Sequence, residues 1–194
     1  MKNKRLWFRL VLIIVGLFVV FMILVLPDLV KRKTIGPGMG AGGRGQATGI
    51  AHDLRSVLHK DSDWRTYYGG LYLSGEKVVV LVTGKYKNAT PEVKEFIKEN
   101  EGIILKKCKY TLLELDELQD ELWEKLDELV EKGNEKQKEF LDRFVSSALY
   151  ENTNCVGVGI KDMTIIDCIR FRIMFGLVGD YRIEFESVGE VILD

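Results

Sequence analysis

The sequence predicts an α+β fold: small, mostly antiparallel sheets with helices packed on one face, preceded by a single N-terminal transmembrane helix. Three observations indicate this arrangement. Residues 10–26 form an apolar run without a charged side chain. Beyond residue 64, short β-branched and aromatic runs alternate with amphipathic helical patterns. Two of those runs, at residues 69–73 and 77–82, are separated by a Ser-Gly-Glu turn, which is typical of a hairpin.

The apolar run is long enough to cross most of a bilayer. As a helix it measures roughly 25 Å, and adding Leu6, Trp7 and Phe8 brings it to the roughly 30 Å of a bilayer core. A cleaved signal peptide is the alternative, but its apolar region usually has about 7–15 residues and ends in small residues at a cleavage site. The run instead ends in Leu26-Pro27-Asp28. A buried core helix is a third interpretation, against which the basic clusters at both ends argue.

Charge around the run predicts its orientation. Four basic residues precede it (Lys2, Lys4, Arg5 and Arg9) and three follow it (Lys31, Arg32 and Lys33). The difference of one charge favours a cytoplasmic N-terminus. We therefore expect a single-pass protein of the cell membrane with an extracytoplasmic globular domain.

Composition divides the chain into three parts. Residues 1–33 form the anchor with its basic flanks, residues 34–48 a glycine-rich flexible tether, and residues 49–194 the globular domain. The tether contains the pattern G-x-G-x-x-G at Gly38, Gly40 and Gly43, but it lacks the preceding strand of a dinucleotide-binding unit. The net charge of −1 gives no footprint for nucleic acid, so none is expected as a partner.

Residues that bind metals or form disulfides give no recognised motif. His52 and His59 are seven residues apart, near several aspartates, but their spacing matches no known ligand set. Neither a metal nor another cofactor is therefore predicted. The three cysteines, Cys108, Cys155 and Cys168, lack C-x-x-C spacing, and one disulfide or three free thiols are both compatible with the sequence.

The first half of the globular domain reads as helix, hairpin, helix and strand. Thr48 is expected to cap a helix over residues 49–60. The hairpin follows, and its second strand is apolar at consecutive positions, so it should be central in its sheet. Thr90-Pro91-Glu92 begins another helix, and residues 103–110 form a third strand whose lysines suit a sheet edge.

The second half begins with a long helix. Thr111 and Glu114 form a capping box at its start, and we expect its leucine stripe to pack on its own sheet. A partner helix follows Gly133-Asn134 and carries Phe140, Leu141, Phe144, Val145 and Ala148 on one side. Next come a strand over 154–160, a helix over 163–175 with the stripe Ile165, Ile166, Ile169 and Ile173, and a strand over 181–186. No internal sequence repeat is evident.

Catalytic motifs are missing from this pattern. G-x-S-x-G does not occur, and Ser146-Ser147 falls within the expected partner helix without a base nearby in the sequence. The acidic residues have the spacing of solvated helix faces. We therefore expect a protein that is not an enzyme.

A group of short motifs resembles a known family. They are Tyr68-Gly69-Gly70-Leu71-Tyr72 before the valine-rich strand, Tyr110-Thr111-Leu112-Leu113-Glu114-Leu115 at the start of the long helix, and Asn154-Cys155-Val156-Gly157-Val158. In this order they resemble the N-terminal proregion of bacterial secreted chymotrypsin-like serine proteases of the streptogrisin and α-lytic type. The resemblance covers roughly residues 64–186. No protease domain follows residue 194 in this sequence.

The resemblance implies a folding assistant and inhibitor that is not itself catalytic. The partner would be a separate peptidase, contacted through Tyr68, Gly69, Gly70 and Tyr72 and through a C-terminal tail containing Val191, Ile192 and Leu193. The tail equally fits a terminal strand. Two other functions stay open from the residues: an anchored structural or assembly subunit, and a metal-dependent hydrolase that uses His52 and His59.

Overall fold

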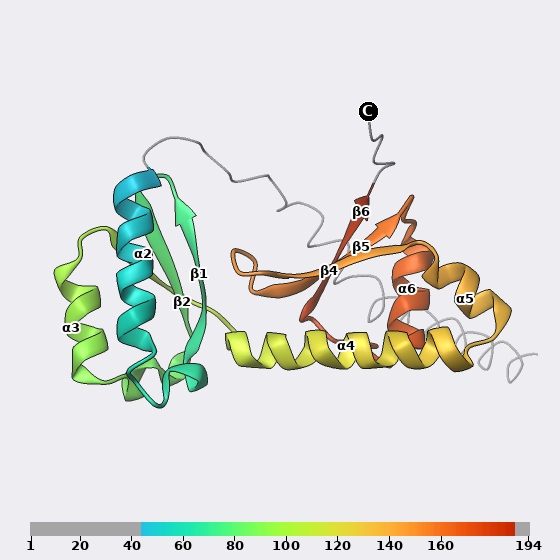
Figure 1. Ribbon diagram of the computed structural model, residues 1–194, viewed down its shortest axis with the longest axis horizontal. Helices are drawn as coiled ribbons and strands as arrows, with labels where there is room; N and C mark the ends of the chain where they lie inside the picture. The colour runs from blue at the N-terminus through green and yellow to red at the C-terminus, as the bar shows by residue number, and fades with distance from the viewer. Residues whose placement is uncertain (1–43, 189–194) are drawn as a thin grey trace, which may run out of the picture.

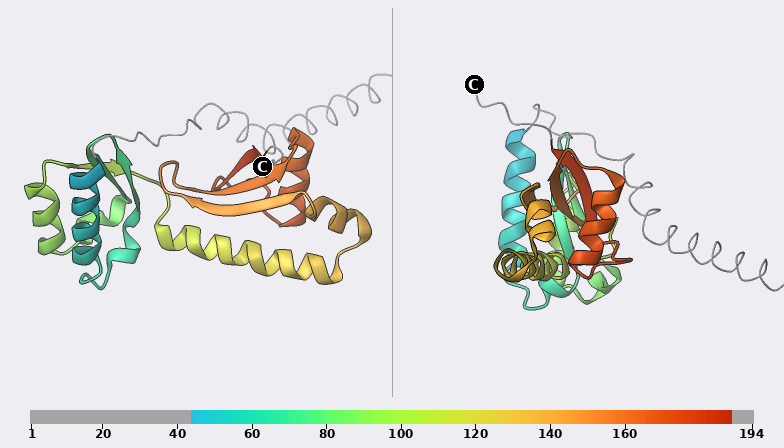
Figure 2. Two further views of the ribbon diagram at one scale, coloured as in Figure 1. Left: turned by 45° about the horizontal axis from the view of Figure 1, so that its top comes forward. Right: turned by 90° about the vertical axis from the view of Figure 1, so that its right-hand side faces the viewer.

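The computed structural model describes residues 44–188, which form an α+β fold built from two three-stranded sheets. The first sheet has the strand order β1-β2-β3 and the second β4-β5-β6. Figure 1 shows the two sheets side by side along the long axis, and Figure 2 shows the same arrangement from two further directions. The apolar run 10–26 and the tail residues Val191, Ile192 and Leu193 lie outside the described residues. No helix within residues 44–188 has both the length and the apolarity needed to span a membrane.

The first unit contains two helices on one face of its sheet (Figure 1). Its elements are α2 (Arg44–Leu58), β1 (Tyr68–Ser74), β2 (Lys77–Val82), α3 (Pro91–Glu99) and β3 (Ile103–Lys107), with short 3-10 helices at Trp64–Thr66 and Gly84–Asn88. The predicted hairpin and the central position of β2 are confirmed. The edge position of β3 is confirmed as well, although this strand is shorter than predicted.

The second unit contains three helices. Its elements are α4 (Leu112–Lys132), α5 (Glu135–Leu141), β4 (Phe144–Tyr150), β5 (Cys155–Lys161), α6 (Ile165–Met174) and β6 (Ile183–Val188). The capping box of Thr111 and Glu114 at the start of α4 is confirmed. Leucines of α4 lie in one buried cluster with Val156, Val158 and Ile160 of β5, so α4 packs on its own sheet as predicted.

The two units repeat one topology. In each, an antiparallel hairpin is followed by a helix and then by a third strand that pairs parallel to the second. Because a helical crossover returns the chain to the end of the sheet where the second strand began, the third strand runs parallel to the second. The sheets are therefore mixed, which corrects the prediction of mostly antiparallel sheets. The two units thus repeat the order and pairing of their elements, although no repeat is evident in the amino-acid sequence.

Three further predictions are wrong. Helix α2 begins at Arg44, so Thr48 does not cap it and the predicted tether loses residues 44–48. Ala47 and Ala51 are buried in the first core and extend the apolar stripe toward the N-terminus, which explains the earlier start. The partner helix ends at Leu141, and the residues from Phe144 form strand β4, where β5 supplies hydrogen-bonding partners that local periodicity does not reveal.

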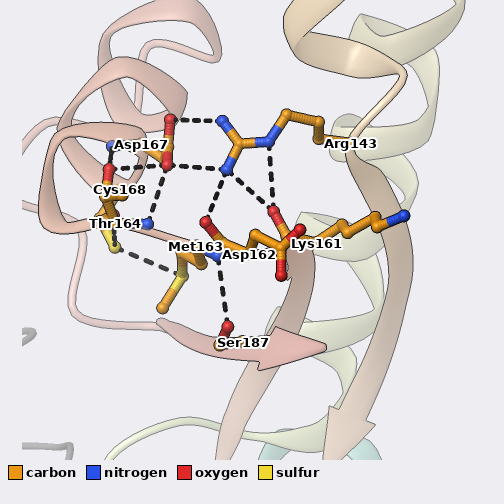
Figure 3. A network of polar contacts seen from close by, with 8 residues as sticks. All are labelled: Arg143, Lys161, Asp162, Met163, Thr164, Asp167, Cys168 and Ser187. Carbon is orange, nitrogen blue, oxygen red and sulfur yellow. Dashed lines mark hydrogen bonds and ion pairs between the residues drawn. The ribbon is translucent and has the colours of Figure 1, made fainter. Parts of the chain in front are cut away.

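The third wrong prediction concerns the buried face of α6. Ile166 and Ile173 are exposed, whereas Asp167, Cys168, Phe171 and Arg172 are buried. A network of polar contacts fixes this orientation (Figure 3). Arg143 donates to both carboxylate oxygens of Asp167 at 3.0 Å and to the carbonyls of Lys161 and Asp162 at 2.8 Å. Asp167 in turn accepts from the backbone N–H of Thr164, the N-cap of α6, at 2.8 Å.

Acid should weaken the second unit through Asp167. Burial by itself raises the pKa of Asp167, but the hydrogen bonds from Arg143 and Thr164 outweigh it and hold the pKa at about 2. Because this pKa lies below the unfolded value of 3.8, the carboxylate stabilises the fold above about pH 4 and loses this effect as the pH falls to about 2. We expect a loss of about 2 kcal/mol over this interval. Chemical unfolding at several pH values measures it, and an Asp167→Asn variant that keeps the full wild-type slope would contradict the assignment.

Candidate functional site

The two units meet at a junction formed by the start of β1. The pairing of β1 with β2 shifts register between Tyr68 and Gly70, which leaves Gly69 in a bulge. A Cβ atom on Gly69 would lie 2.3 Å from Sγ of Cys108 and 2.8 Å from the carbonyl oxygen of Tyr110. Gly70 has φ of +116°, a conformation that side chains rarely adopt. Gly69 is therefore required by the close approach of Cys108 and Tyr110, and Gly70 by its backbone conformation.

Asn154 links the two units through its side chain. Its Nδ2 donates to the carbonyl of Gly69 at 3.1 Å and to the carbonyl of Tyr110 at 2.9 Å, while its Oδ1 accepts from the N–H of Tyr110 at 2.9 Å. Asn154 is buried and has φ of +56°, a conformation that asparagine tolerates better than most residues. From the same β4–β5 loop, Glu151 accepts a hydrogen bond from the N–H of Leu71.

A pocket of about 280 Å³ opens beside this junction. Cys108 and Cys155 contribute to its lining, and its polar lining includes Lys106, Lys107, Lys109, Tyr110, Asn152 and Tyr181. The ammonium group of Lys109 lies 5.0 Å from the ring centre of Tyr110 and 5.3 Å from that of Tyr181. Because the three lysines are exposed, the pocket has a positively charged rim that suits an acidic ligand.

Within the described residues, no disulfide joins Cys108, Cys155 and Cys168. Of the two alternatives that the sequence left open, the structure therefore has the three thiols and not the disulfide. Burial raises the pKa of Cys108 to about 11, so this thiol stays protonated near neutral pH and is a weak nucleophile. The pocket therefore fits binding better than thiol chemistry at Cys108.

The two histidines do not form a site with the aspartates. His52 is exposed, with Nδ1 3.5 Å from Asp53, and the ring of His59 stacks on Trp64 at 5.0 Å between ring centres. Within the part of the chain that the structure describes, His, Cys, Asp and Glu side chains form no group of three that would hold a metal ion.

The predicted partner-binding residues Tyr68, Gly69, Gly70 and Tyr72 all lie in β1. Their positions indicate a role in packing the junction for most of them. Tyr68 is 3% exposed and both glycines are buried, so these three residues offer little surface for direct contact with a partner. Tyr72 is half-buried, with the ammonium group of Lys106 6.0 Å from its ring centre. Whether a partner touches this region stays a prediction.

Sequence reasoning missed the residues that complete the site. Glu151, Asn152 and Tyr181 come from the second unit and reach the pocket or the bulge only through the fold. The sequence did contain one signal for this junction, the pair Gly69-Gly70, because adjacent glycines within a strand indicate a bulge or a close approach of another segment.

Comparison of the chain with protein-family models and with curated proteins finds no match. The resemblance to protease proregions is therefore carried only by the motifs quoted above.

Proposed function

We propose that this protein is a single-pass membrane-anchored, non-catalytic module that binds a separate protein. The apolar run 10–26 supports the anchor, and the resemblance to protease proregions supports the non-catalytic binding role. The observation that carries the proposal is the convergence of the motifs. Gly69, Tyr110 and Asn154 come from the three separate motifs, and they bond or touch one another at a single junction. Motifs that are far apart in the sequence thus correspond to one structural feature.

The surface that best suits a protein partner lies beside the junction. Strand β3 is at a sheet edge, and Ile104 and Leu105 are exposed along it. An edge strand has backbone groups that an extended segment of another protein can pair with. The lysines at the end of β3 form the rim of the pocket, so we expect the partner to contribute an acidic, extended segment.

Affinity capture from the protein's own cell envelope tests this function. The full-length chain is expected to recover a stoichiometric partner protein, in particular a peptidase. Reversing the rim charges with Lys106→Glu, Lys107→Glu and Lys109→Glu together should reduce recovery about tenfold, because charge complementarity steers such contacts.

The matched control reverses three exposed lysines elsewhere on the first unit: Lys85, Lys87 and Lys98. It changes the net charge equally and should leave recovery unchanged. Equal losses in both triple variants would show a nonspecific charge effect. Recovery of no stoichiometric protein by the unaltered chain would contradict the proposed function itself.

A further inference from the structure

Helix α6 is apolar on two opposite faces. Its inner face contributes Cys168 and Phe171 to the second core, where Phe171 lies 5.4 Å from Phe185 between ring centres. Its outer face carries Ile166, Ile169 and Ile173, and the first and last of these are 64% and 61% exposed. The spacing of three and four residues puts these isoleucines on one stripe. A helix normally turns its apolar stripe toward other parts of the protein, so an apolar stripe that faces outward needs an explanation.

The outward position of the stripe is fixed by buried polar groups. Arg172 is buried and donates to the carbonyls of Leu177 at 3.3 Å and Ile183 at 3.4 Å. Asp167 is buried beside Arg143 at 3.0 Å. Turning the helix to bury the isoleucines would move both charged groups out of these contacts. The exposed stripe is therefore a constant feature of the fold.

The stripe on α6 is too small to hold a second copy of the chain by itself. A helix of ten residues is about 15 Å long and about 10 Å wide. Such a face covers far less than the roughly 800 Å² that each partner contributes to a stable interface. An occupant that is held close by other means does not need a large area.

A lipid surface is an occupant that other means, namely the proposed anchor, hold close to the stripe. The proposed anchor at residues 10–26 leaves seventeen residues, 27–43, before the described fold, which span at most about 60 Å when extended. The fold is thus confined near the bilayer, where a small apolar face can bind at the headgroup boundary. Arg170 is exposed and lies between the isoleucines in the sequence, and exposed Val178 follows the helix. The Arg170 guanidinium lies 5.5 Å from the ring centre of Phe140, and its exposed side remains suited to lipid phosphate.

We infer that the stripe of Ile166, Ile169 and Ile173 on α6 docks onto the lipid surface to which the anchor tethers the domain. This inference rests on the anchoring part of the proposed function. Docking would hold the second unit against the bilayer. It would thereby limit the directions from which a partner can approach the junction.

Photocrosslinking of the full chain in vesicles tests this contact. The vesicles contain phosphatidylethanolamine and phosphatidylglycerol, and p-benzoylphenylalanine replaces Ile166, Ile173 or Val130 in separate variants. Val130 on α4 is the matched control, because it is an exposed β-branched residue at 55%. Lipid adducts, detected by mass, should form at Ile166 and Ile173 about fivefold more often than at Val130.

Three results would overturn the docking inference: crosslinks from α6 to a second copy, crosslinks from α6 to residues 189–194, or lipid adducts equally frequent at Val130. A complete lack of lipid adducts would overturn it as well. Carbonate extraction of the same vesicles separates this failure from failure of the anchor. A chain that stays in the pellet without lipid adducts refutes docking alone, whereas a chain released by carbonate refutes both docking and anchoring.

Discussion

Replacing Asn154 with alanine is expected to destabilise the fold by about 4 kcal/mol, the largest effect of any single substitution considered. The change removes the three hydrogen bonds to Gly69 and Tyr110. Each is worth about 1 kcal/mol, and buried backbone groups left without partners add to the cost. Alanine at φ of +56° adds about 1 kcal/mol more. Urea unfolding of the detergent-solubilised chain measures the difference.

Two control variants separate the loss of the hydrogen bonds from the cost of the backbone conformation at residue 154. Asn154→Gly accepts the same backbone conformation but lacks the side chain, so it should still lose about 3 kcal/mol. Asn152→Ala changes an exposed residue of the same loop and should alter stability by no more than about 0.5 kcal/mol. If Asn154→Gly were as stable as the unaltered chain, the hydrogen bonds would not hold the units together.

Replacing Gly69 with alanine is expected to cost about 3 kcal/mol through overpacking. Rotation of the Cys108 side chain can relieve the contact of 2.3 Å with its sulfur. The contact of 2.8 Å with the carbonyl of Tyr110 cannot be relieved in this way, because that carbonyl belongs to the backbone and accepts from Asn154. Thermal unfolding should show the loss as a lower midpoint.

Gly49→Ala is the matched control for this substitution. Gly49 lies within α2 and has no atom within 4 Å of an added Cβ. The same chemical change should therefore raise stability by about 0.5–1 kcal/mol, because alanine favours the helix. A stabilising effect at both glycines would contradict the close approach at the junction.

Local signals in the sequence were sufficient for part of the fold. The hairpin, the central position of β2 and the capping box at Thr111 each depend on residues close in sequence, and each is confirmed. Strand β4 was mistaken for helix because Phe144 and Ala148 also fit a helical stripe that continues from Phe140. Only its pairing with β5 distinguishes the two, and that pairing is not visible in β4 alone.

The orientation of α6 and the pocket depend on distant residues. The isoleucine stripe has the stronger periodicity, but burial of Asp167 and Arg172 decides which face turns inward. Those charged residues can be buried only because Arg143 and the carbonyls of Leu177 and Ile183 meet them. The pocket likewise needs Lys109 from one unit and Tyr181 from the other.

The junction of Gly69, Tyr110 and Asn154 joins the two repeated units into one body. Hydrogen exchange of β2 and β5 at increasing urea concentrations tests it most directly. In the unaltered chain, both strands should lose protection at the same urea concentration, and Asn154→Ala should separate them. Midpoints that already differ by about 1 M or more in the unaltered chain would show that the units unfold independently, contrary to this account.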